Sequence, residues 1–593
     1  MTEPPLANHG ASTPSRGWWS GVASLVVAAA LFGVATAALT WPAAIAPRSV
    51  LIGHAGNDTW NHVWGFWWVA EEVLVHHRWP GWTDLQAWPT GGALYFIDTF
   101  NALVGLPVQA LAGPVATHNC IVAGSLWFSA MAAWALARHL TRDPAAALVA
   151  GVAYGFCPHV LAQAHNGITE SLDIGWFALY LLALLRLLEE PRLLRGLLAW
   201  AALAACGVFN WYYGLFAALV TPILLGWRAW QGEVAWRRVL GAGLLGAVLV
   251  GPLAAAALWT LKSSMDAPDA LVNRDAEFVW NSLIYHNMTD LQCLFRPGKF
   301  YSPDLNAAYG EELIIVVYVG WALLVLAAAA LLAVRPRRPM VPWLVIAGVF
   351  GIFCLGPYLY AFGRYPEVGG HRIPLPFLAF FHALPLFSRI SHPFRFVVGV
   401  ELGLGLVAAL GLGAWLKGRP RTLAWAVSLL AAGAILAETS FVSPAIVPVA
   451  HADAYVPAGY RHIVEDPEPG AVLDLPIAFP LLERAVYNWY QVTHGRPIPY
   501  TLNEPLPPGL KHNQLARFLL DLEASRARLL PRTLPDLELV VSARVLARQG
   551  YRWVVVHDRL YPELKRRQVC AVLTGLCGPP TYEDGELTIY RIP

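Results

Sequence analysis

The chain has 593 residues, of which 57% are hydrophobic and only 13% are charged. Soluble domains carry charge on about a quarter of their residues, so this composition excludes an ordinary soluble fold, a disordered chain and a small disulfide scaffold. The 26 Trp, 24 Phe and 21 Tyr agree with a membrane protein, because aromatic rings gather at membrane–water interfaces. The net charge is only +2, and the sequence contains no stripe of basic residues. We therefore expect no nucleic-acid partner.

Eleven apolar windows are long enough, at roughly 20 residues, to cross the hydrocarbon core as helices. They lie near 20–45, 118–138, 145–163, 171–188, 196–210, 212–227, 239–261, 312–333, 341–361, 394–416 and 422–443. A shorter apolar stretch at 100–116 contains Pro107 and Pro114, which predicts a helix embedded in the membrane or lying at its interface. The predicted fold class is therefore a membrane all-α domain of about 11 transmembrane helices.

Basic residues occur in alternate connections between these windows. They are Arg138, Arg142, Arg186, Arg192, Arg195, Arg228, Arg237, Arg238, Arg335, Arg337, Arg338, Lys417, Arg419 and Arg421. Basic residues in short loops stay on the cytoplasmic side. The alternation predicts a multi-pass protein of the plasma (inner) membrane, with a cytoplasmic tail at 1–19, a transmembrane domain at 20–444, and external loops at 46–117, 262–311 and 362–393.

The composition changes after residue 444. Strand-like runs at 471–475, 552–557 and 586–590 alternate with helix-like stretches near 509–527, 536–549 and 560–575. About 150 residues suffice for one compact core, so residues 445–593 predict a small extracytoplasmic α/β domain. Within it, Cys570 and Cys577 lie on the oxidising side and either form a disulfide or remain free.

Within the predicted C-terminal domain, the segment 488–491 is rich in aromatic and amide side chains. Such residues can stack on sugar rings. They can equally form the edge of a core, and both interpretations stay open.

The first predicted external loop carries the clearest candidate for chemistry. Asp58 is the single carboxylate within 53–69 and precedes an aromatic-rich, interface-type helix. A carboxylate there would lie at the level of lipid headgroups. The alternative is that Asp58 only caps the helix that begins at Thr59, as Asp often does.

This arrangement resembles the GT-C superfamily of membrane glycosyltransferases. The resemblance covers the first-loop Asp, the interface helix, the number of spans and the outer C-terminal domain, together with the segments 94–107, 113–119, 164–167 and 384–396. It implies sugar transfer from a polyprenyl-phosphate-linked donor to an external lipid or cell-envelope glycan, within membrane lipid. Asp58 matches the first-loop acid of the superfamily, which implies the role of a general base or of a group that orients the acceptor.

Some members of the superfamily bind a divalent metal through two acids of the first loop or an acid of a later loop. This chain has Asp58 alone rather than a doublet, which leaves a metal requirement open. His54 and His62 lie four residues to either side of Asp58 and could share a helical face that binds zinc. Gly53 and Gly56 argue against an unbroken helix there.

Glu311 and Glu312 form a second acidic position, at the outer start of the eighth window. They could assist Asp58 in catalysis. They could instead only face the positive end of a helix dipole.

A lipid phosphate needs cationic partners at the outer interface. Arg389 and Arg395 are the preferred pair, because they bracket His392 directly before the tenth window. Further candidates for substrate binding are Arg364, Arg372 and His165. The alternative for the arginines is contact with lipid headgroups by snorkelling side chains.

Glu401 is the clearest charge inside a predicted span, and such groups are usually functional. Glu170 and Asp173, at the start of the fourth window, could line the same cavity or simply cap a helix. The rival function is a non-enzymatic lipid or polysaccharide transporter, which would place coupling charges near the middle of the membrane.

Overall fold

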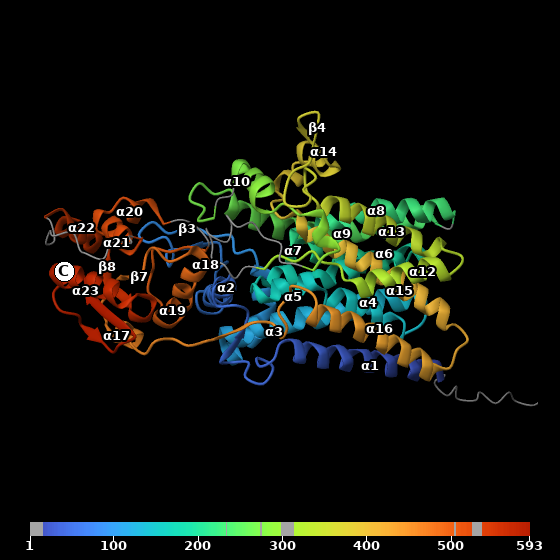
Figure 1. Ribbon diagram of the computed structural model, residues 1–593, viewed down its shortest axis with the longest axis horizontal. Coiled ribbons are helices and arrows are strands. Elements are labelled where there is room, and N and C mark those ends of the chain that lie inside the picture. The colour runs from blue at the N-terminus through green and yellow to red at the C-terminus, as the bar shows by residue number, and fades with distance from the viewer. Residues whose placement is uncertain (1–15, 233, 273–274, 298–313, 503–505, 525–536) are drawn as a thin grey trace, which may run out of the picture.

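The computed structural model describes residues 16–232, 234–272, 275–297, 314–502, 506–524 and 537–593. Figure 1 shows an elongated molecule with a bundle of long helices at one end and a sheet with its own helices at the other. Helix α2 (Thr59–Ala70) lies between the two parts.

Long apolar helices occupy all eleven predicted windows, α4 and α5 sharing one of them. They are α1 (Arg16–Leu39), α3 (Thr99–Thr141), α4 (Ala147–Gly155), α5 (Pro158–His165), α6 (Ile174–Glu189), α7 (Leu193–Phe209), α8 (Trp211–Gln231), α9 (Trp236–Met265), α12 (Trp321–Ala333), α13 (Val341–Cys354), α15 (Val397–Leu416) and α16 (Arg421–Phe441). Within the described residues, 7 helical segments are long and apolar enough to cross a membrane, and three shorter apolar segments accompany them. The chain is a multi-pass membrane protein, whereas the count of eleven spans stays a prediction.

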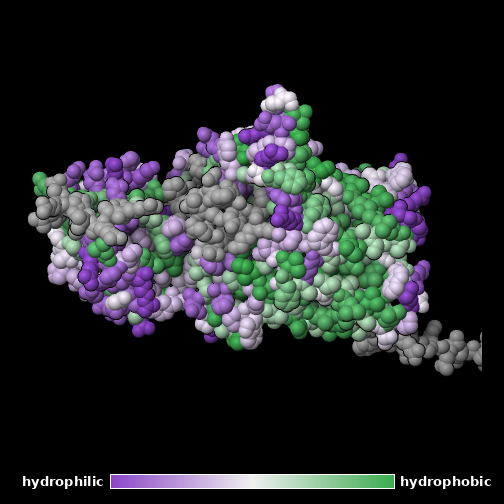
Figure 2. All heavy atoms as spheres, viewed as in Figure 1, coloured by the Kyte–Doolittle hydropathy of each residue, from purple (hydrophilic) through white to green (hydrophobic). Residues whose placement is uncertain are grey.

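The surface of the helical part is apolar over wide areas, which Figure 2 shows in green, whereas hydrophilic residues cover the opposite end of the molecule. Side chains such as Leu244, Leu253 and Leu430 point outward from α9 and α16 and are exposed. Large exposed apolar faces of this kind are expected where lipid rather than water surrounds a helix.

Helix α3 consists of two helical segments joined at a kink. Gly113 has φ +81° and ψ 179°, a conformation that glycine adopts without strain, and Pro114 begins the second segment. The predicted helix at 100–116 is confirmed as helical structure, and the kink at Gly113 separates it from the span that follows. Its position at the membrane interface stays a prediction.

The eighth predicted window differs from the structure at its start. The helix α12 begins at Trp321, whereas residues 314–319 are buried but not helical. The amide of Asn166 replaces a helical partner there, because its Nδ2 donates to the Ile314 carbonyl at 2.6 Å and its Oδ1 accepts from the Ile314 N–H at 2.9 Å. Non-helical backbone at membrane depth is stable when protein groups satisfy it in this way, and the β-branched run at 314–317 favours an extended chain.

The connections that carry cations meet at one end of the helical part. Gly21 in α1 lies against Arg138 at the end of α3. Glu189, at the end of α6, pairs with His139 at 3.0 Å and with Arg228 at 3.1 Å. The alternating basic loops thus share one end of the bundle, and its cytoplasmic location stays a prediction.

Two further segments connect the helices at the other end. The first carries α10 (Ala276–Asn281) after α9. The second carries the short hairpin β4 (Glu367–Val368) and β5 (His371–Arg372), followed by α14 (Pro376–Ala383), and projects from the bundle in Figure 1.

The described residues of the range 454–593 fold around a four-stranded sheet in the order β7-β8-β10-β9. The strands are β7 (Ala471–Leu475), β8 (Tyr551–His557), β9 (Tyr582–Glu583) and β10 (Leu587–Arg591). Strands β7 and β8 run parallel and the other pairs are antiparallel. The helices of this part are α17 (Tyr460–Glu465), α18 (Leu481–Arg484), α19 (Val486–His494), α20 (Pro508–Lys511), α21 (Gln514–Ala524), α22 (Leu537–Arg548) and α23 (Glu563–Cys577).

The possible disulfide between Cys570 and Cys577 is not formed. Both residues lie in the continuous helix α23 and both thiols are free. Seven helical residues separate two positions by about 10 Å along the axis, whereas a disulfide needs Cα atoms within about 7 Å. The spacing that suggested a bridge therefore prevents one once the segment is helical.

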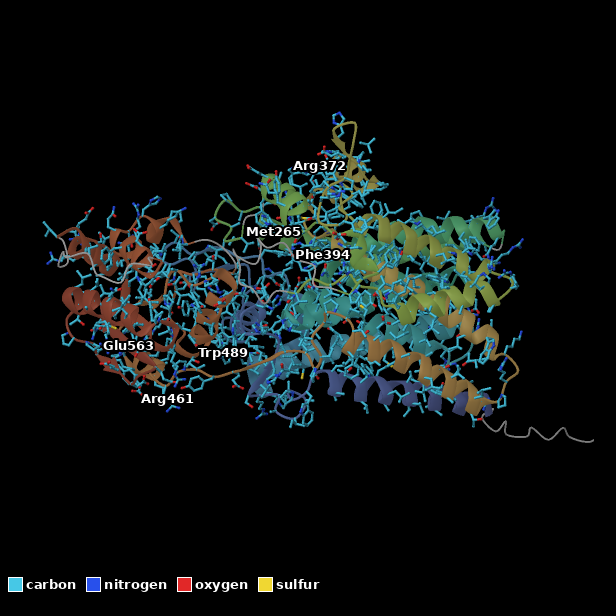
Figure 3. All side chains as sticks on the ribbon, viewed as in Figure 1. Met265, Arg372, Phe394, Arg461, Trp489 and Glu563 are labelled. Carbon is cyan, nitrogen blue, oxygen red and sulfur yellow. The ribbon has the colours of Figure 1, made fainter. Side chains whose placement is uncertain are left out.

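The C-terminal part is attached to the first loop. Strand β1 (Val50–Ile52) pairs antiparallel with β6 (His451–Asp453), the first strand after the last apolar helix. Trp60 of α2 stacks on Trp489 of α19 with ring centroids 5.8 Å apart, and Figure 3 shows Trp489 on the side of the C-terminal part that faces the helices. The aromatic stretch at 488–491 therefore contributes to an interface between the two parts.

Candidate active site

Asp58 occupies the position before the first turn of α2. Its side chain makes no capping bond to the backbone of that turn, and its Oδ1 instead accepts a hydrogen bond from Asn61 Nδ2 at 2.7 Å. The backbone of Asp58 is bound to a segment distant in sequence, since its N–H donates to the Asn166 carbonyl at 3.1 Å. The carboxylate is therefore positioned by side-chain and loop contacts rather than used as a helix cap.

Two glycines close on the first residue of α2. Gly53 has φ +126° and Gly167 has φ +72°, and a Cβ on either would come within 2.5 Å of the Thr59 side chain. The close approach brings the loops at 53–58 and 165–167 together, so that Asp58 lies at their junction.

His62, one turn after Asp58, lies at the centre of a group of buried carboxylates. Its Nε2 is 3.5 Å from Glu170 Oε2 and 4.0 Å from Asp58 Oδ2, and its Nδ1 is 3.7 Å from Asp98 Oδ2. Three segments far apart in sequence thus supply one acid each. We name His62 with these three acids the His62 cluster.

Asp98 is fixed by neutral donors on both oxygens. Thr169 donates its hydroxyl to Asp98 Oδ2, and Asn101 Nδ2 donates to Asp98 Oδ1 at 2.7 Å. The same Asn101 amide lies 2.6 Å from Asp173 Oδ2, so it joins Asp98 to a fourth carboxyl.

Arg395 approaches the cluster from the opposite side. Its Nη2 donates to Glu170 Oε1 at 3.3 Å, and its guanidinium lies 4.9 Å from the centroid of the Tyr212 ring. Both members of the ion pair are buried, with 7% and 3% of their side-chain area exposed. The backbone turn at Pro393–Phe396 places Arg395 just before α15, next to Phe394, which Figure 3 labels inside the molecule.

The electrostatics of the cluster favour a charged His62. Burial alone would lower the pKa of His62, but the interactions of its ring with the carboxylates of Asp98, Glu170 and Asp58 outweigh burial and raise the pKa to about 9. His62 then carries a positive charge at neutral pH.

Exposure separates Asp58 from the rest of the cluster. Its side chain is 21% exposed, whereas those of His62, Asp98 and Glu170 are each at most 3% exposed. Asp58 is thus the carboxylate of the His62 cluster that a substrate can reach.

The cluster lies at one end of the helical part, opposite the cations. Helices α3, α6 and α15 all begin beside it and end near the basic connections. The 20 residues of α15 span about 30 Å, which is the thickness of the hydrocarbon core. The cluster therefore lies at the level of one membrane surface if the basic end lies at the other.

The predicted cationic residues do not gather in one place. Arg395 belongs to the site, and His392 is next to it, with Nδ1 2.7 Å from Ser391 Oγ. Arg389 is exposed and contributes, after Lys262, to lowering the pKa of Asp266. The preferred pair is therefore divided between a buried and an exposed position.

Arg364 and Arg372 lie in the projecting hairpin. Arg364 is exposed, and Arg372 packs over the ring of Tyr365 at 4.3 Å. Figure 3 shows Arg372 near the top of the projection, away from α2. Glu311 and Glu312 lie outside the described residues.

His165 is buried behind the first loop. Its ring stacks on His54 at 5.3 Å. Because α2 begins at Thr59, His54 lies outside the helix and the zinc-binding face with Asp58 and His62 does not form.

A divalent metal ion does not fit the His62 cluster. Magnesium and calcium need about six oxygen ligands around one point. The imidazole ring fills the space between the three carboxylates, and both of its nitrogens face them. Within the described residues, no group of three or more His, Cys, Asp and Glu side chains could hold a metal ion.

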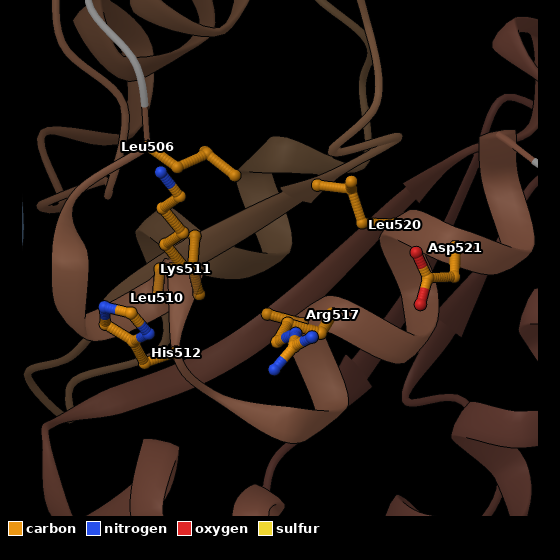
Figure 4. A pocket seen from close by; sticks show the side chains of 8 residues that line it. Leu506, Leu510, Lys511, His512, Arg517, Leu520 and Asp521 are labelled. Atoms are coloured by element: carbon orange, nitrogen blue, oxygen red, sulfur yellow. The ribbon is translucent and has the colours of Figure 1, made fainter.

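A depression elsewhere on the molecule shares no residue with this site. It measures about 410 Å³ between α20 and α21 (Figure 4). Its lining residues include Leu510, Lys511, His512, Arg517 and Asp521. We assign it no role in the chemistry at Asp58.

The sequence patterns single out Asp58 and Arg395 as candidates but not the histidine between them. They present His62 only as a possible zinc ligand, and Asp98 only within the segment 94–107. The signal for His62 was its spacing of four residues from Asp58 on a helix, which places the two side chains on one face. No sequence spacing links Asp58 to Asp98 or Glu170.

Comparison with solved structures identifies the fold. The arabinofuranosyltransferase AftD from Mycobacteria aligns with a TM-score of 0.54 at 17% identity, over 98% of this chain and 42% of AftD. The oligosaccharyltransferase of Archaeoglobus fulgidus aligns at 0.49 and 13% identity, over 94% of this chain and 71% of that one. ArnT from Cupriavidus metallidurans, solved with undecaprenyl phosphate, aligns at 0.47 and 14% identity, over 98% and 99% of the two chains.

No protein-family model and no curated protein sequence matches the chain. The likeness to AftD assigns the fold, and the chain spans less than half of the length of that enzyme. The chain therefore has the fold of the GT-C membrane glycosyltransferases.

Proposed function

We propose that this protein is an integral membrane glycosyltransferase. It transfers a sugar from a polyprenyl-phosphate-linked donor to a lipid or cell-envelope glycan acceptor outside the cytoplasm, with Asp58 as the general base. The observation that carries the proposal is the position of Asp58, a partly exposed carboxylate at the edge of a buried charge network in a GT-C fold.

The chemistry requires a base beside the reacting carbon. A hydroxyl oxygen of the acceptor attacks the anomeric carbon, the bond from that carbon to the phosphate oxygen breaks, and the hydroxyl proton moves to the base. The hydrogen bond from Asn61 occupies Asp58 Oδ1 and orients the carboxylate.

The leaving phosphate needs a cation, and Arg395 is the predicted residue that lies nearest to this chemistry. Its guanidinium is tied to Glu170, but its buried Nε makes no hydrogen bond within the described part of the chain. A buried donor without a partner is costly, and a phosphate oxygen would satisfy it. We propose that Arg395 and His392 bind the phosphate, whereas Arg389 and the hairpin arginines contact lipid headgroups.

Replacement of Asp58 by Asn tests the role of the base. We expect Asp58→Asn to lower transfer by about 10²–10⁴-fold, because the amide cannot accept the proton. Asp84→Asn is the matched control, since Asp84 is an exposed acid of the same loop outside the cluster. Mass spectrometry of lipids bound to the purified protein identifies the carrier, and radiolabelled sugar then measures transfer from it.

Wild-type transfer by Asp58→Asn would exclude Asp58 as the base. A transporter would move a labelled lipid or glycan across sealed vesicles without forming a new glycosidic bond. For such a transporter the buried carboxyl of Glu401 is a candidate coupling charge, so Glu401→Gln would abolish that movement.

A further inference from the structure

The hydrogen-bond pattern around His62 defines its protonation state. Thr169 donates its single proton to Asp98, so its oxygen must accept from its other neighbour. That neighbour is His62 Nδ1, at 2.7 Å from Thr169 Oγ1. Nδ1 therefore carries a proton.

The other ring nitrogen faces oxygens that can only accept. Glu170 Oε2 is buried, has no hydrogen-bond partner within the described residues, and lies 3.5 Å from His62 Nε2. Asp58 Oδ2 lies on the same side at 4.0 Å. A proton on Nε2 satisfies these carboxylates, whereas a lone pair would face them. Both nitrogens are then donors, which defines an imidazolium.

The charged and titratable groups directly around His62 come from three elements. Asp58 precedes α2, Asp98 precedes α3, and Glu170 lies in the turn η2 (Thr169–Leu172). His118 of α3 lies nearby, and its Nε2 is 2.9 Å from the Ile52 carbonyl. His118 and the Arg395 guanidinium beyond Glu170 are the basic groups near His62, and the three acids outnumber them, so the local field favours a cation at the position of His62.

From this geometry we infer that His62 is an imidazolium that acts as the fixed cation of the acidic site, and that the His62 cluster binds no divalent metal ion. The ring carries one positive charge between Asp58, Asp98 and Glu170, and Arg395 carries a second on the far side of Glu170. His62 is a positioning residue, because it orients Asp58 and Glu170 without touching substrate. The consequence that transfer is independent of divalent metal rests on the proposed function.

The protonation of His62 is measurable without any transfer assay. In protein labelled with ¹⁵N-histidine, the solid-state NMR difference between wild type and His62→Gln isolates the ring of His62. We expect two protonated nitrogens at pH 7.5 and loss of a proton only near pH 9, in agreement with the raised pKa. His76→Gln is the control, because His76 is an exposed histidine of the same loop.

Metal binding is measured with Mn²⁺ and EPR on the same purified protein. Wild type should bind no stoichiometric Mn²⁺ at millimolar concentration. His62→Ala should gain a site, because removal of the ring leaves three carboxylates around an empty space, and His76→Ala should not. Transfer by the wild type, once its donor is known, should be unchanged by EDTA.

The inference is overturned by a neutral His62 ring at pH 7.5, or by one Mn²⁺ per wild-type protein that Glu170→Gln removes. If His62→Ala fails to fold, the measurements on wild type still decide between these outcomes. Absence of transferase activity would refute the proposed function and leave the protonation and metal-binding results standing.

Discussion

At the scale of single residues, the buried ion pair between Arg395 and Glu170 holds the site together. Taking two charges out of water is expensive, and removal of one partner leaves the other buried without compensation. Among the described residues, His62 at 3.5 Å and the Ser171 hydroxyl at 3.4 Å then remain beside the Glu170 carboxylate. The stability of the protein should therefore fall when one of the two residues is replaced, and fall less when both are replaced together.

Arg395→Met should lower the free energy of unfolding by about 3–5 kcal/mol. Arg395→Met combined with Glu170→Gln should recover part of that loss, because no unpaired charge stays buried. Unfolding midpoints from intrinsic tryptophan fluorescence test this as a double-mutant cycle. Additive effects of the two replacements would show that the residues do not interact. Transfer should stay low in both variants if Arg395 also binds the phosphate.

At the scale of elements, buried side-chain amides connect the helical part with the C-terminal part. Gln86 Nε2 donates to Asn488 Oδ1 at 3.1 Å, and Asn488 Nδ2 donates to Asn61 Oδ1 at 2.7 Å. Asn61 in turn donates to Asp58. A continuous row of buried amides thus connects α19 of the C-terminal part with the candidate base.

Asn488→Leu should break this row and reduce transfer more than it reduces stability. Asn61 loses its buried donor, and its hydrogen bond to Asp58 becomes less well oriented. We expect kcat to fall about tenfold with KM nearly unchanged, which is about 1.4 kcal/mol at the transition state. The matched control Asn513→Leu removes a buried amide of the same part that bonds Ser542 instead. Equal losses of kcat in the two variants would contradict a specific role for Asn488.

Helices and strands were predictable from the sequence where the hydrophobic residues follow a single pattern, either a long apolar run or a short strand-like run. The strand β7 has the predicted bounds 471–475, and β8 and β10 lie within one residue of the predicted runs. The start of α12 was not predictable, because hydropathy does not distinguish a buried extended segment from a helix. The cluster was not predictable either, since Asp98 and Glu170 meet His62 only through the packing of α3 and the turn after α5.

The orientation in the membrane is a property of the whole molecule. The basic connections share one end of the bundle, and the His62 cluster and the C-terminal part lie toward the other. The positive-inside rule then predicts that the cluster lies on the outer side of the membrane.

Single cysteines in a cysteine-free background test this orientation. We expect Arg567→Cys, at an exposed position of α23, to react with a membrane-impermeant maleimide in intact cells. Arg421→Cys, at the start of α16, should react only after the membrane is opened. The reverse pattern would invert the topology and place Asp58 in the cytoplasm.

The two glycines that close on Thr59 restrict the amino acids that the chain tolerates. Gly167 combines a positive φ with a Cβ position that would lie 2.2 Å from Thr59 Oγ1, so every other residue there is both strained and in collision. Gly495 has a similar φ of +62° but open space around it. In a saturation library selected for function, position 167 should return glycine alone, whereas position 495 should also admit asparagine and aspartate.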